Sequence, residues 1–192
     1  MKKNLSKIVL SIFLGLSSLY SAGGVELNIN DNAVELQIDT NLNQYYELDN
    51  ANDYYVSLGV LHEDTDAPNL FNVGLKATTS EFDTENIEFG LGIGMVASSQ
   101  DSDTFLAVPF SLSASYHVND KVLIEAEGKY SPSVLSFSKA DKFTSIKATV
   151  NYQLLVNGYI FVGIRDIETK YSSSVGTIEY DDSIFVGYKV KF

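Results

Sequence analysis

Residues 182–192 read DSIFVGYKVKF, and their side chains alternate between two kinds. One face would carry the apolar side chains Ile184, Val186, Tyr188, Val190 and Phe192, and the other Phe185, Gly187, Lys189 and Lys191. Because successive side chains of a strand point to opposite faces, this pattern predicts a β-strand with one apolar side. Bulky apolar groups that continue to Phe192 predict a partner strand that holds this end of the chain in place.

The same alternation recurs along the sequence, and no convincing helical period follows residue 24. Eight runs stand out, at residues 54–62, 70–79, 87–97, 104–118, 121–131, 143–154, 158–167 and 183–192. Several of these runs reach the ~9–11 residues that a tilted strand needs to cross a bilayer. The pattern therefore predicts an all-β protein, and its strand lengths suit a membrane.

A shorter hairpin is predicted within residues 24–39, GVELNINDNAVELQID. Its apolar positions are odd before Asp31 and even after it, which a two-residue turn at Asp31-Asn32 would reconcile. That turn would pair Ile29 with Val34, Leu27 with Leu36, and Val25 with Ile38. With the hairpin in the barrel there would be ten strands, which we favour slightly; with it apart from the barrel there would be eight.

The first residues, MKKNLSKIVLSIFLGLSSLYSAGG, have the layout of a secretory signal peptide. Lysines precede an apolar stretch at residues 8–20 that is too short for a membrane helix, and small residues follow. We expect cleavage after Ala22, so that residues 1–22 are removed and residues 23–192 form the barrel, with the main strands in 54–192. The 25 acidic residues against 13 basic ones argue against nucleic acid as a partner, and there is no cysteine for a disulfide or a thiolate site.

The connections between the runs differ in length. Those at residues 119–120 and 155–157 are short, and those at 63–69, 98–103, 132–142 and 168–182 are longer. Outer-membrane barrels have short periplasmic turns and longer extracellular loops. The alternation of lengths predicts a closed antiparallel up-and-down transmembrane β-barrel, with Phe192 at the periplasmic side. Residues 40–53 are long for a periplasmic turn and are the exception.

The content of the two faces predicts which one is in lipid. In residues 87–96 one face is wholly apolar, whereas the other contains Glu88 and three glycines. Glycine weakens a strand and gains nothing from exposure to water, but it makes room inside a narrow barrel. We therefore predict a lipid-facing apolar side and a polar lumen, with a soluble lipocalin-like barrel as the minor alternative. The predicted lumen-lining residues are Lys76, Glu88, Gly90, Gly92, Gly94, Glu125, Glu127, Lys129, Lys147, Arg165 and Lys189.

Tyrosines near the ends of the runs fit an interfacial girdle, in which a ring lies at the lipid boundary with its hydroxyl hydrated. These are Tyr54, Tyr116, Tyr130, Tyr152 and Tyr188. The alternative is ordinary aromatic packing.

Two resemblances add to this reading. The terminal FVGYKVKF resembles the signal by which the barrel-assembly machinery recognises its clients, with Gly187, Val190 and Phe192 at the typical spacing and Phe185 where a polar residue is usual. The chain also resembles the YfaZ family of outer-membrane proteins. This second resemblance rests on GLGIGMVASSQDSDTFLAVPFSLSASYHV, KYSPSVLSFSKADKF and FVGIRDIETKY. It implies a small barrel in the outer membrane of a Gram-negative bacterium and no established activity.

No catalytic, cofactor-binding or metal-binding residues are predicted. GLGIG lacks the spacing and the helix of a dinucleotide loop. The two histidines, His62 and His117, are expected at opposite ends of the barrel, which argues against a metal site or an acid–base site that uses both. The one enzymatic candidate is then His62 with Glu63, Asp64 or Asp66.

The predicted extracellular loops are acidic. The residues concerned are Glu63, Asp64, Asp66, Asp101, Asp103, Glu168, Glu179, Asp181 and Asp182. Such loops suit solvation, or divalent cations that bridge to lipopolysaccharide.

Charges of both signs in a narrow lumen should pair, because an isolated buried ion is costly. The sequence therefore predicts a structural or interaction protein with a mostly plugged lumen, in contact with outer-membrane lipid and lipopolysaccharide and, during biogenesis, with the assembly machinery. A narrow porin-like channel for small solutes is the alternative, and a surface hydrolase that uses His62 is less favoured. The oligomeric state stays open.

Overall fold

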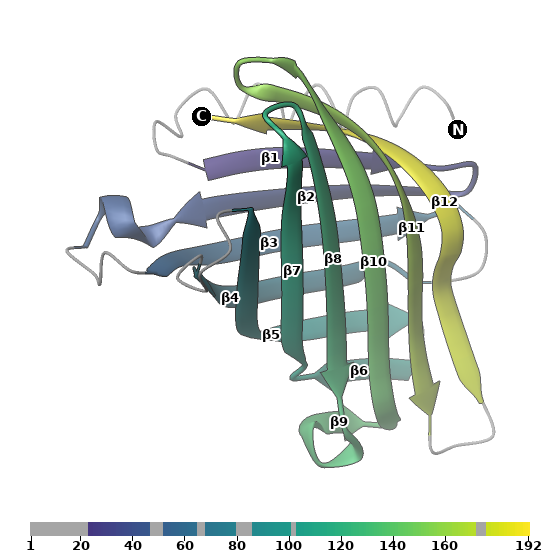
Figure 1. The fold of residues 1–192 in the computed structure, drawn as a ribbon. Coiled ribbons are helices and arrows are strands. Elements are labelled where there is room, and N and C mark those ends of the chain that lie inside the picture. Colours follow the sequence, from purple (N-terminus) through teal and green to yellow (C-terminus); the bar gives the residue numbers. More distant parts are fainter. Residues whose placement is uncertain (1–22, 47–51, 65–67, 80–85, 101–102, 172–175) are drawn as a thin grey trace.

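The computed structural model describes residues 23–46, 52–64, 68–79, 86–100, 103–171 and 176–192. These residues form one antiparallel sheet that is rolled into a barrel (Figure 1). Its strands are β1 (Gly23–Ile29), β2 (Ala33–Asn41), β3 (Asn52–Glu63), β4 (Leu70–Thr79), β5 (Ile87–Gln100), β6 (Asp103–Ala107), β7 (Phe110–Asn119), β8 (Val122–Ser131), β9 (Ser136–Ser138), β10 (Ala140–Leu155), β11 (Gly158–Tyr171) and β12 (Thr177–Lys191). Two 3-10 turns, η2 (Leu42–Gln44) and η3 (Ser133–Leu135), interrupt them. No helix among the described residues is long and apolar enough to cross a membrane.

The first and last strands close the barrel. β1 pairs with β12 in a register that joins Gly24 to Lys191 and Ile29 to Val186. Beyond the strand ends, the Gly23 N–H donates to the Phe192 carbonyl over 2.8 Å, and the Phe192 N–H donates to the Gly23 carbonyl over 3.0 Å. The terminal stretch therefore ends in a paired strand, so no backbone edge is left open to lipid at this point.

The barrel has ten strands around its wall, the number that the sequence slightly favoured. β6 and β7 both pair with β5, and they share one register. The pairing is interrupted only at Pro109, whose carbonyl still accepts from the Gly94 N–H over 2.9 Å. Proline has no N–H to donate, which explains the break. β9 continues the wall beyond β8 and pairs with β6. The twelve described strands thus count as ten, because β6–β7 and β8–β9 each act as one.

The predicted N-terminal hairpin is confirmed, residue for residue. β1 and β2 pair Val25 with Ile38, Leu27 with Leu36, and Ile29 with Val34. The Asn30 side-chain oxygen accepts from the N–H groups of Asn32 and Ala33, over 2.8 and 2.6 Å, and so orders the turn. The hairpin is part of the barrel wall and not a separate appendage.

Three of the predicted loops are shorter than expected. β5 runs to Gln100, β10 begins at Ala140, and β11 and β12 extend to Tyr171 and from Thr177, so most of 168–182 is strand. The physical reason is that the outward side chains, such as Lys170 and Glu179, become polar at this end of the strands, whereas Tyr171 and Tyr180 are buried inside. The apolar alternation then fades, although the backbone ladder continues, as in the pairing of Glu168 with Glu179.

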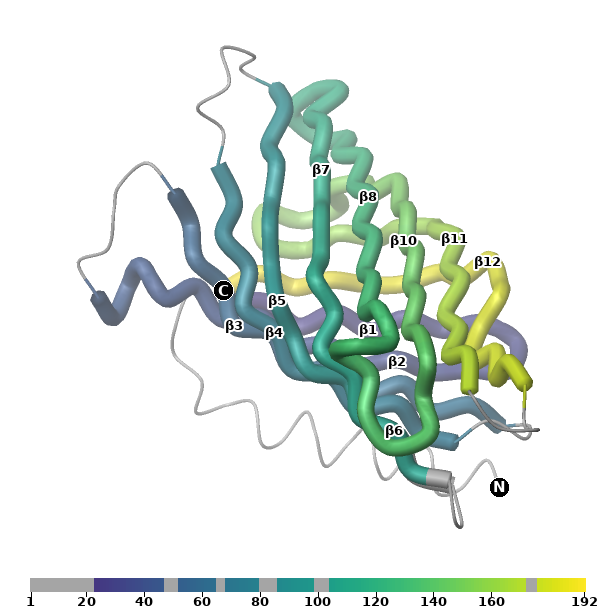
Figure 2. The backbone as a smooth tube through the Cα atoms, turned by 90° about the horizontal axis from the view of Figure 1, so that it is seen from below, coloured from purple at the N-terminus to yellow at the C-terminus, as the bar shows by residue number. Residues whose placement is uncertain are grey.

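The two halves of the wall cross at a steep angle. In Figure 1, β7, β8, β10, β11 and β12 run down the front, while β1 to β5 run across behind them; Figure 2 gives the view from below.

We name the two ends of the barrel by what they hold. The terminal end contains Gly23, Phe192 and the turns at residues 120–121 and 156–157, and the loop end contains β9 and the β1–β2, β3–β4 and β11–β12 connections.

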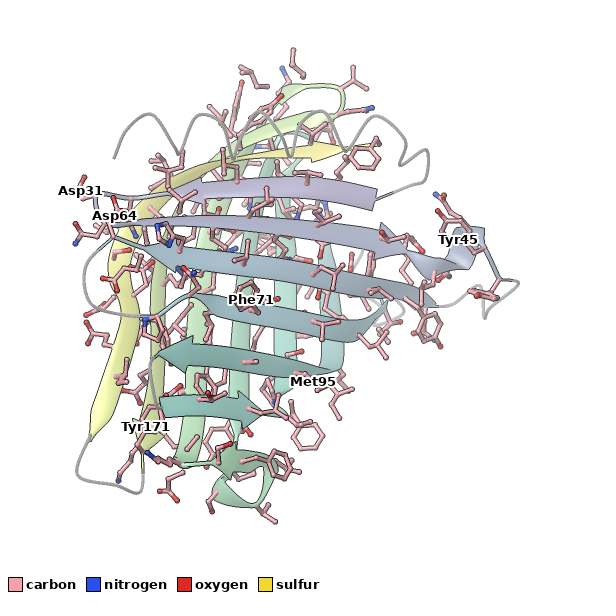
Figure 3. All side chains as sticks on the ribbon, turned by 180° about the vertical axis from the view of Figure 1, so that it is seen from behind. Asp31, Tyr45, Asp64, Phe71, Met95 and Tyr171 are labelled. Carbon is pink, nitrogen blue, oxygen red and sulfur yellow. The ribbon has the colours of Figure 1, made fainter. Side chains whose placement is uncertain are left out.

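The outward face is apolar. Leu91 is 68% exposed and Ile184 is 71% exposed, and aliphatic and aromatic side chains continue around the wall. Figure 3 shows Phe71 and Met95 on this face, with Asp31 and Asp64 at one end of the barrel and Tyr45 at the other. A surface of this kind would be unfavourable in water, but it matches the hydrocarbon region of a bilayer.

Candidate functional site: the barrel interior

The interior at the loop end is filled by an apolar cluster. Phe105 is fully buried there, and its ring centroid lies 6.2 Å from Phe143, 6.2 Å from Tyr171 and 6.0 Å from Tyr180. The cluster consists of Ala33, Leu61, Leu70, Val96, Phe105, Ala107, Ala140, Phe143, Ile167, Tyr171 and Tyr180. Its members come from the loop-end parts of eight strands, so this part of the lumen is packed like a protein core.

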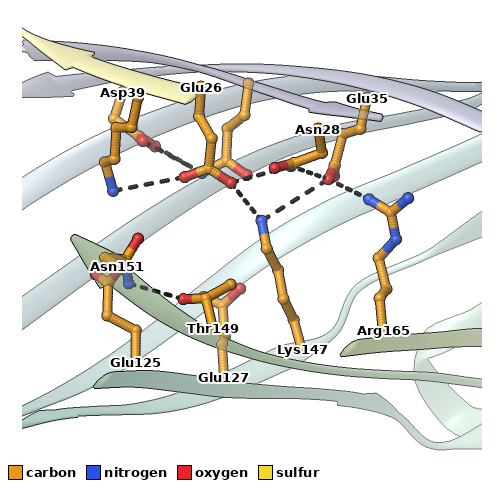
Figure 4. A network of polar contacts seen from close by, with 12 residues as sticks. Glu26, Asn28, Glu35, Asp39, Glu125, Glu127, Lys147, Thr149, Asn151 and Arg165 are labelled. Atoms are coloured by element: carbon orange, nitrogen blue, oxygen red, sulfur yellow. Dashed lines mark hydrogen bonds and ion pairs between the residues drawn. The ribbon is translucent and has the colours of Figure 1, made fainter. Parts of the chain in front are cut away.

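Next to the cluster lies a buried ion network, part of which is drawn in Figure 4. It comprises Glu26, Asn28, Glu35, Lys147, Arg165, Asp181 and Lys189. The Lys147 ammonium lies 2.5 Å from Glu26 and 3.8 Å from Glu35. The Lys189 ammonium reaches the other Glu26 oxygen at 3.5 Å. Strands from opposite walls are thereby tied together across the lumen.

Arg165 is the most buried cation of the network. Its guanidinium donates to Glu35 and to Asp181, the latter through both Nε, over 2.8 Å, and Nη2. The Asn28 amide donates to Glu26 over 3.0 Å and to Glu35 over 2.7 Å. Each buried carboxylate therefore has at least one cationic partner, as a low-dielectric interior requires.

Two phenylalanines form the surface beneath these cations. The Phe185 ring lies opposite Gly163 in the β11–β12 ladder, and the Phe161 ring lies opposite Gly187. The two rings pack edge to face at 6.1 Å, and the Arg165 guanidinium lies 5.0 Å from the Phe185 centroid. Each glycine makes room for a ring from the neighbouring strand. This explains why Phe185 replaces the polar residue that is usual at its position.

At the terminal end the interior is hollow. A cavity of about 310 Å³ is lined by small, polar and charged side chains, and its rim includes Gly23, Asn41, His117, Lys191 and Phe192. A smaller chamber of about 120 Å³ shares part of that lining and reaches Glu26 and Lys147. The ion network is therefore the floor of the cavity.

Most of the predicted lumen-lining residues lie around this cavity. Gly94, Lys76, Glu88, Glu125, Glu127, Lys129 and Lys189 line it directly. Glu127 pairs with Lys129 at 3.1 Å, and Glu125 accepts from the Asn151 amide over 2.9 Å. Lys147 and Arg165 belong to the network. Gly90 and Gly92 lie opposite Ser113 and Ser111, so that this wall carries only small side chains.

The predicted lumen-lining set did not include the polar residues that β1 and β2 contribute to the interior, among them Glu26, Asn28, Glu35 and Asp39. The sequence contained the signal, because these residues alternate with the apolar positions of the predicted hairpin and therefore lie on the other face of its strands.

Asp181 was assigned to an extracellular loop, and this assignment is wrong. It lies in β12, next to a register shift at Ile167/Glu168, and its side chain pairs with Arg165. β12 begins at Thr177, before the predicted run at residues 183–192, and Asp181 continues the inward face of that run, which also carries Phe185 and Lys189. Asp66 and Asp101 lie outside the described residues.

The predicted interfacial and assembly residues are placed as follows. Tyr54, Tyr116, Tyr152 and Tyr188 lie near the terminal end, and Tyr130 lies toward the loop end. All but Tyr54 are exposed on the outward face. Gly187 lies beneath the Phe161 ring, Val190 pairs with Val25, and Phe192 is at the cavity rim.

The two histidines lie at opposite ends of the barrel, His62 in β3 and His117 in β7. His62 is exposed, and its Nδ1 lies 2.6 Å from the Asn69 side-chain oxygen and its Nε2 3.4 Å from Asp64. No group of three or more metal-binding side chains occurs in the described parts of the chain.

Comparison with known proteins establishes the family. The family described as "YfaZ precursor" matches residues 6–192, nearly the whole sequence. The chain belongs to the YfaZ family. The word precursor denotes a chain that is made with a removable leader, and the barrel carries a lipid-matched outer face. A YfaZ member with this fold is an exported protein of the outer membrane. The leader predicted at 1–22 lies outside the described residues.

Solved structures with a similar fold are distant from this YfaZ chain. A membrane protein from a study of in-meso crystallization is 9% identical, with a TM-score of 0.46 over 89% of this chain and 83% of that one. OmpT of Vibrio cholerae is 12% identical, with a TM-score of 0.41 over 83% of this chain and 56% of that one. A mutant porin of Rh. blastica is 11% identical, with a TM-score of 0.21 over 88% and 98%. No curated protein matches. None of these likenesses carries an argument about function.

Proposed function

We propose that the protein is a structural or interaction component of the outer membrane whose lumen gives no continuous path for ions. The observation that carries this proposal is the apolar cluster around the fully buried Phe105 at the loop end. The neighbouring ion network narrows the lumen further, because Arg165 and Lys147 reach across it to carboxylates that neutralise them. A ten-stranded barrel has little more interior than an eight-stranded one, whose side chains just fill it.

The proposed partners follow from the surfaces. Outer-membrane lipid and lipopolysaccharide would contact the apolar outer face and the acidic residues of the loop end. During biogenesis, Gly187, Val190 and Phe192 would be read by the barrel-assembly machinery.

Conductance in planar bilayers tests the sealed lumen. The wild-type barrel should give no steady current, whereas Phe105→Ala, which opens a gap in the apolar cluster, should give brief openings. Phe110→Ala is the matched control, because Phe110 is exposed on the outer wall. Heat-shifted migration on detergent gels would confirm that each variant is folded. A steady wild-type current of the size that a small porin gives would overturn the proposal.

A narrow channel for small solutes is the second candidate. Its support is the charged cavity of about 310 Å³ at the terminal end, which would be one half of such a pathway. The same recordings separate the two functions, because a channel would conduct without any substitution.

The proposal includes no enzymatic role. The described contacts of the exposed His62 are with Asn69 and Asp64, and neither is a serine, threonine or cysteine that a histidine base would activate. If purified protein hydrolysed lipid or peptide substrates and His62→Ala abolished the turnover, this part of the proposal would be wrong.

A further inference from the structure

The terminal-end cavity has an unusual charge balance. Four basic side chains, Lys76, Lys129, Lys189 and Lys191, and four acidic ones, Asp39, Glu88, Glu125 and Glu127, line it, so the lining carries many charges but no formal net charge. From the geometry of this cavity we propose that it is a binding site for a small zwitterionic solute, of the size of an amino acid or dipeptide, which enters from the periplasmic side.

Some of these charges are already used within the protein and others are available. Lys129 pairs with Glu127 at 3.1 Å, and Lys189 pairs with Glu26 at 3.5 Å. In the described part of the chain, Lys76 and Lys191 instead lie near aromatic rings, 6.0 Å from the Tyr55 centroid and 5.1 Å from the Tyr159 centroid. These two ammonium groups can therefore receive a carboxylate.

The acidic side chains of the cavity include two that could receive an ammonium group. Asp39 accepts from the Gln37 amide over 3.0 and 3.2 Å, which leaves its charge without a cation in contact. Within the described residues, Glu88 lies within ion-pair distance of no lysine or arginine. An ammonium group would be attracted to these carboxylates, whereas a solute with a single charge would meet a like charge in the same cavity. A solute with both charges satisfies both sets.

The volume sets the size of the solute. Because a water molecule takes about 30 Å³ of liquid, a cavity of about 310 Å³ holds roughly ten waters or one small polar molecule. The rings of Tyr55 and Phe192 add apolar contact in the lining. The floor is the ion network, so the solute would bind at the terminal end and would not pass through.

Calorimetric titration of the folded barrel in detergent micelles with glycylglycine tests the proposal. We expect saturable binding, weakened about tenfold or more by Lys76→Met and by Glu88→Gln, since each removes one charged partner. Lys76→Arg should retain most of the binding. Glycinamide and N-acetylglycine, each with a single charge, should bind at least about tenfold more weakly for the same reason.

The control is Lys142→Met, which removes a lysine whose partner is Glu168 at the loop end, away from the cavity. It should leave glycylglycine binding unchanged. The proposal would be overturned if the wild-type barrel did not bind glycylglycine, or if both cavity variants bound it as tightly as the wild type does. It would also be overturned if the single-charge analogues bound as tightly as glycylglycine. This proposal can be tested separately from the sealed lumen. A barrel that conducts ions and still binds glycylglycine would contradict the sealed lumen but not the binding site.

Discussion

The two ends of the barrel interior are bounded by the same strands, yet one end is packed and the other is hollow. Strand β5 shows the difference within its own length, because Gly90, Gly92 and Gly94 lie toward the terminal end and Val96 lies in the apolar cluster. Across from them, β7 presents Ser111 and Ser113, whereas β6 presents Phe105. Alternation decides which side chains point inward, and their size decides whether the lumen is filled.

The ion network between the two ends should give the largest effect on stability. Arg165→Met leaves the carboxylates of Glu35 and Asp181 buried without this cation, and losing one partner of a buried pair costs about 3–5 kcal/mol. The measurement is urea unfolding of the refolded barrel in micelles. Lys142→Met is the matched control, because the pair with Glu168 is partly exposed and should be worth less than about 1 kcal/mol. Equal losses from the two variants would mean that the network does not hold the two walls together.

The outer face should give the next effect. Leu91→Lys puts a charge into the middle of the apolar belt, which we expect to cost about 2–4 kcal/mol in a bilayer. Val118→Lys, beside the terminal-end turn, is near the interface, where the same charge costs at most about 1 kcal/mol. Unfolding titrations in lipid vesicles compare the two. If Leu91→Lys were tolerated as well as Val118→Lys, this face would not be in hydrocarbon.

The glycines beneath the aromatic rings should give a smaller effect. A Cβ added at Gly187 would collide with the Phe161 ring and lie 2.7 Å from the Asn28 side-chain oxygen, so Gly187→Ala should cost about 1–3 kcal/mol by overpacking. The control Gly128→Ala has nothing within 4 Å and should change stability by less than about 1 kcal/mol. Adding Phe161→Leu to Gly187→Ala should recover part of the loss. Without such recovery, the contact between ring and glycine would not be the cause.

The sequence predicted the wall of the barrel better than its contents. Alternation identified the strand types, the register of the hairpin and the lipid-facing side, because each of these depends on residues that are near one another in the chain. The ion network depends on which strands meet across the lumen, and Lys147 and Glu26 are 121 positions apart. Asp181 was misplaced for a local reason, because the predicted run began at residue 183, whereas the strand and its inward face extend back to Asp181.

The apolar cluster also could not be predicted from the alternation of the sequence. Phe105 and Tyr180 occur in segments that alternate weakly, so the pattern alone did not mark them as inward residues. Only the pairing of β6 with β5 and β9 and of β12 with β11 brings these rings into the same part of the lumen.

Site-resolved paramagnetic broadening of the wild-type barrel in lipid bicelles tests the central claim most directly, because it needs no substitution. A spin-labelled lipid should broaden the side-chain signals of Leu91, Val162 and Ile184, and a water-soluble nickel chelate should broaden those of Ser115 and His117 at the terminal end. Neither reagent should broaden Phe105. Strong broadening of Phe105 by the nickel chelate, or protection of Leu91 and Ile184 from the lipid label, would contradict a barrel with an apolar outer face and a lumen packed at its loop end.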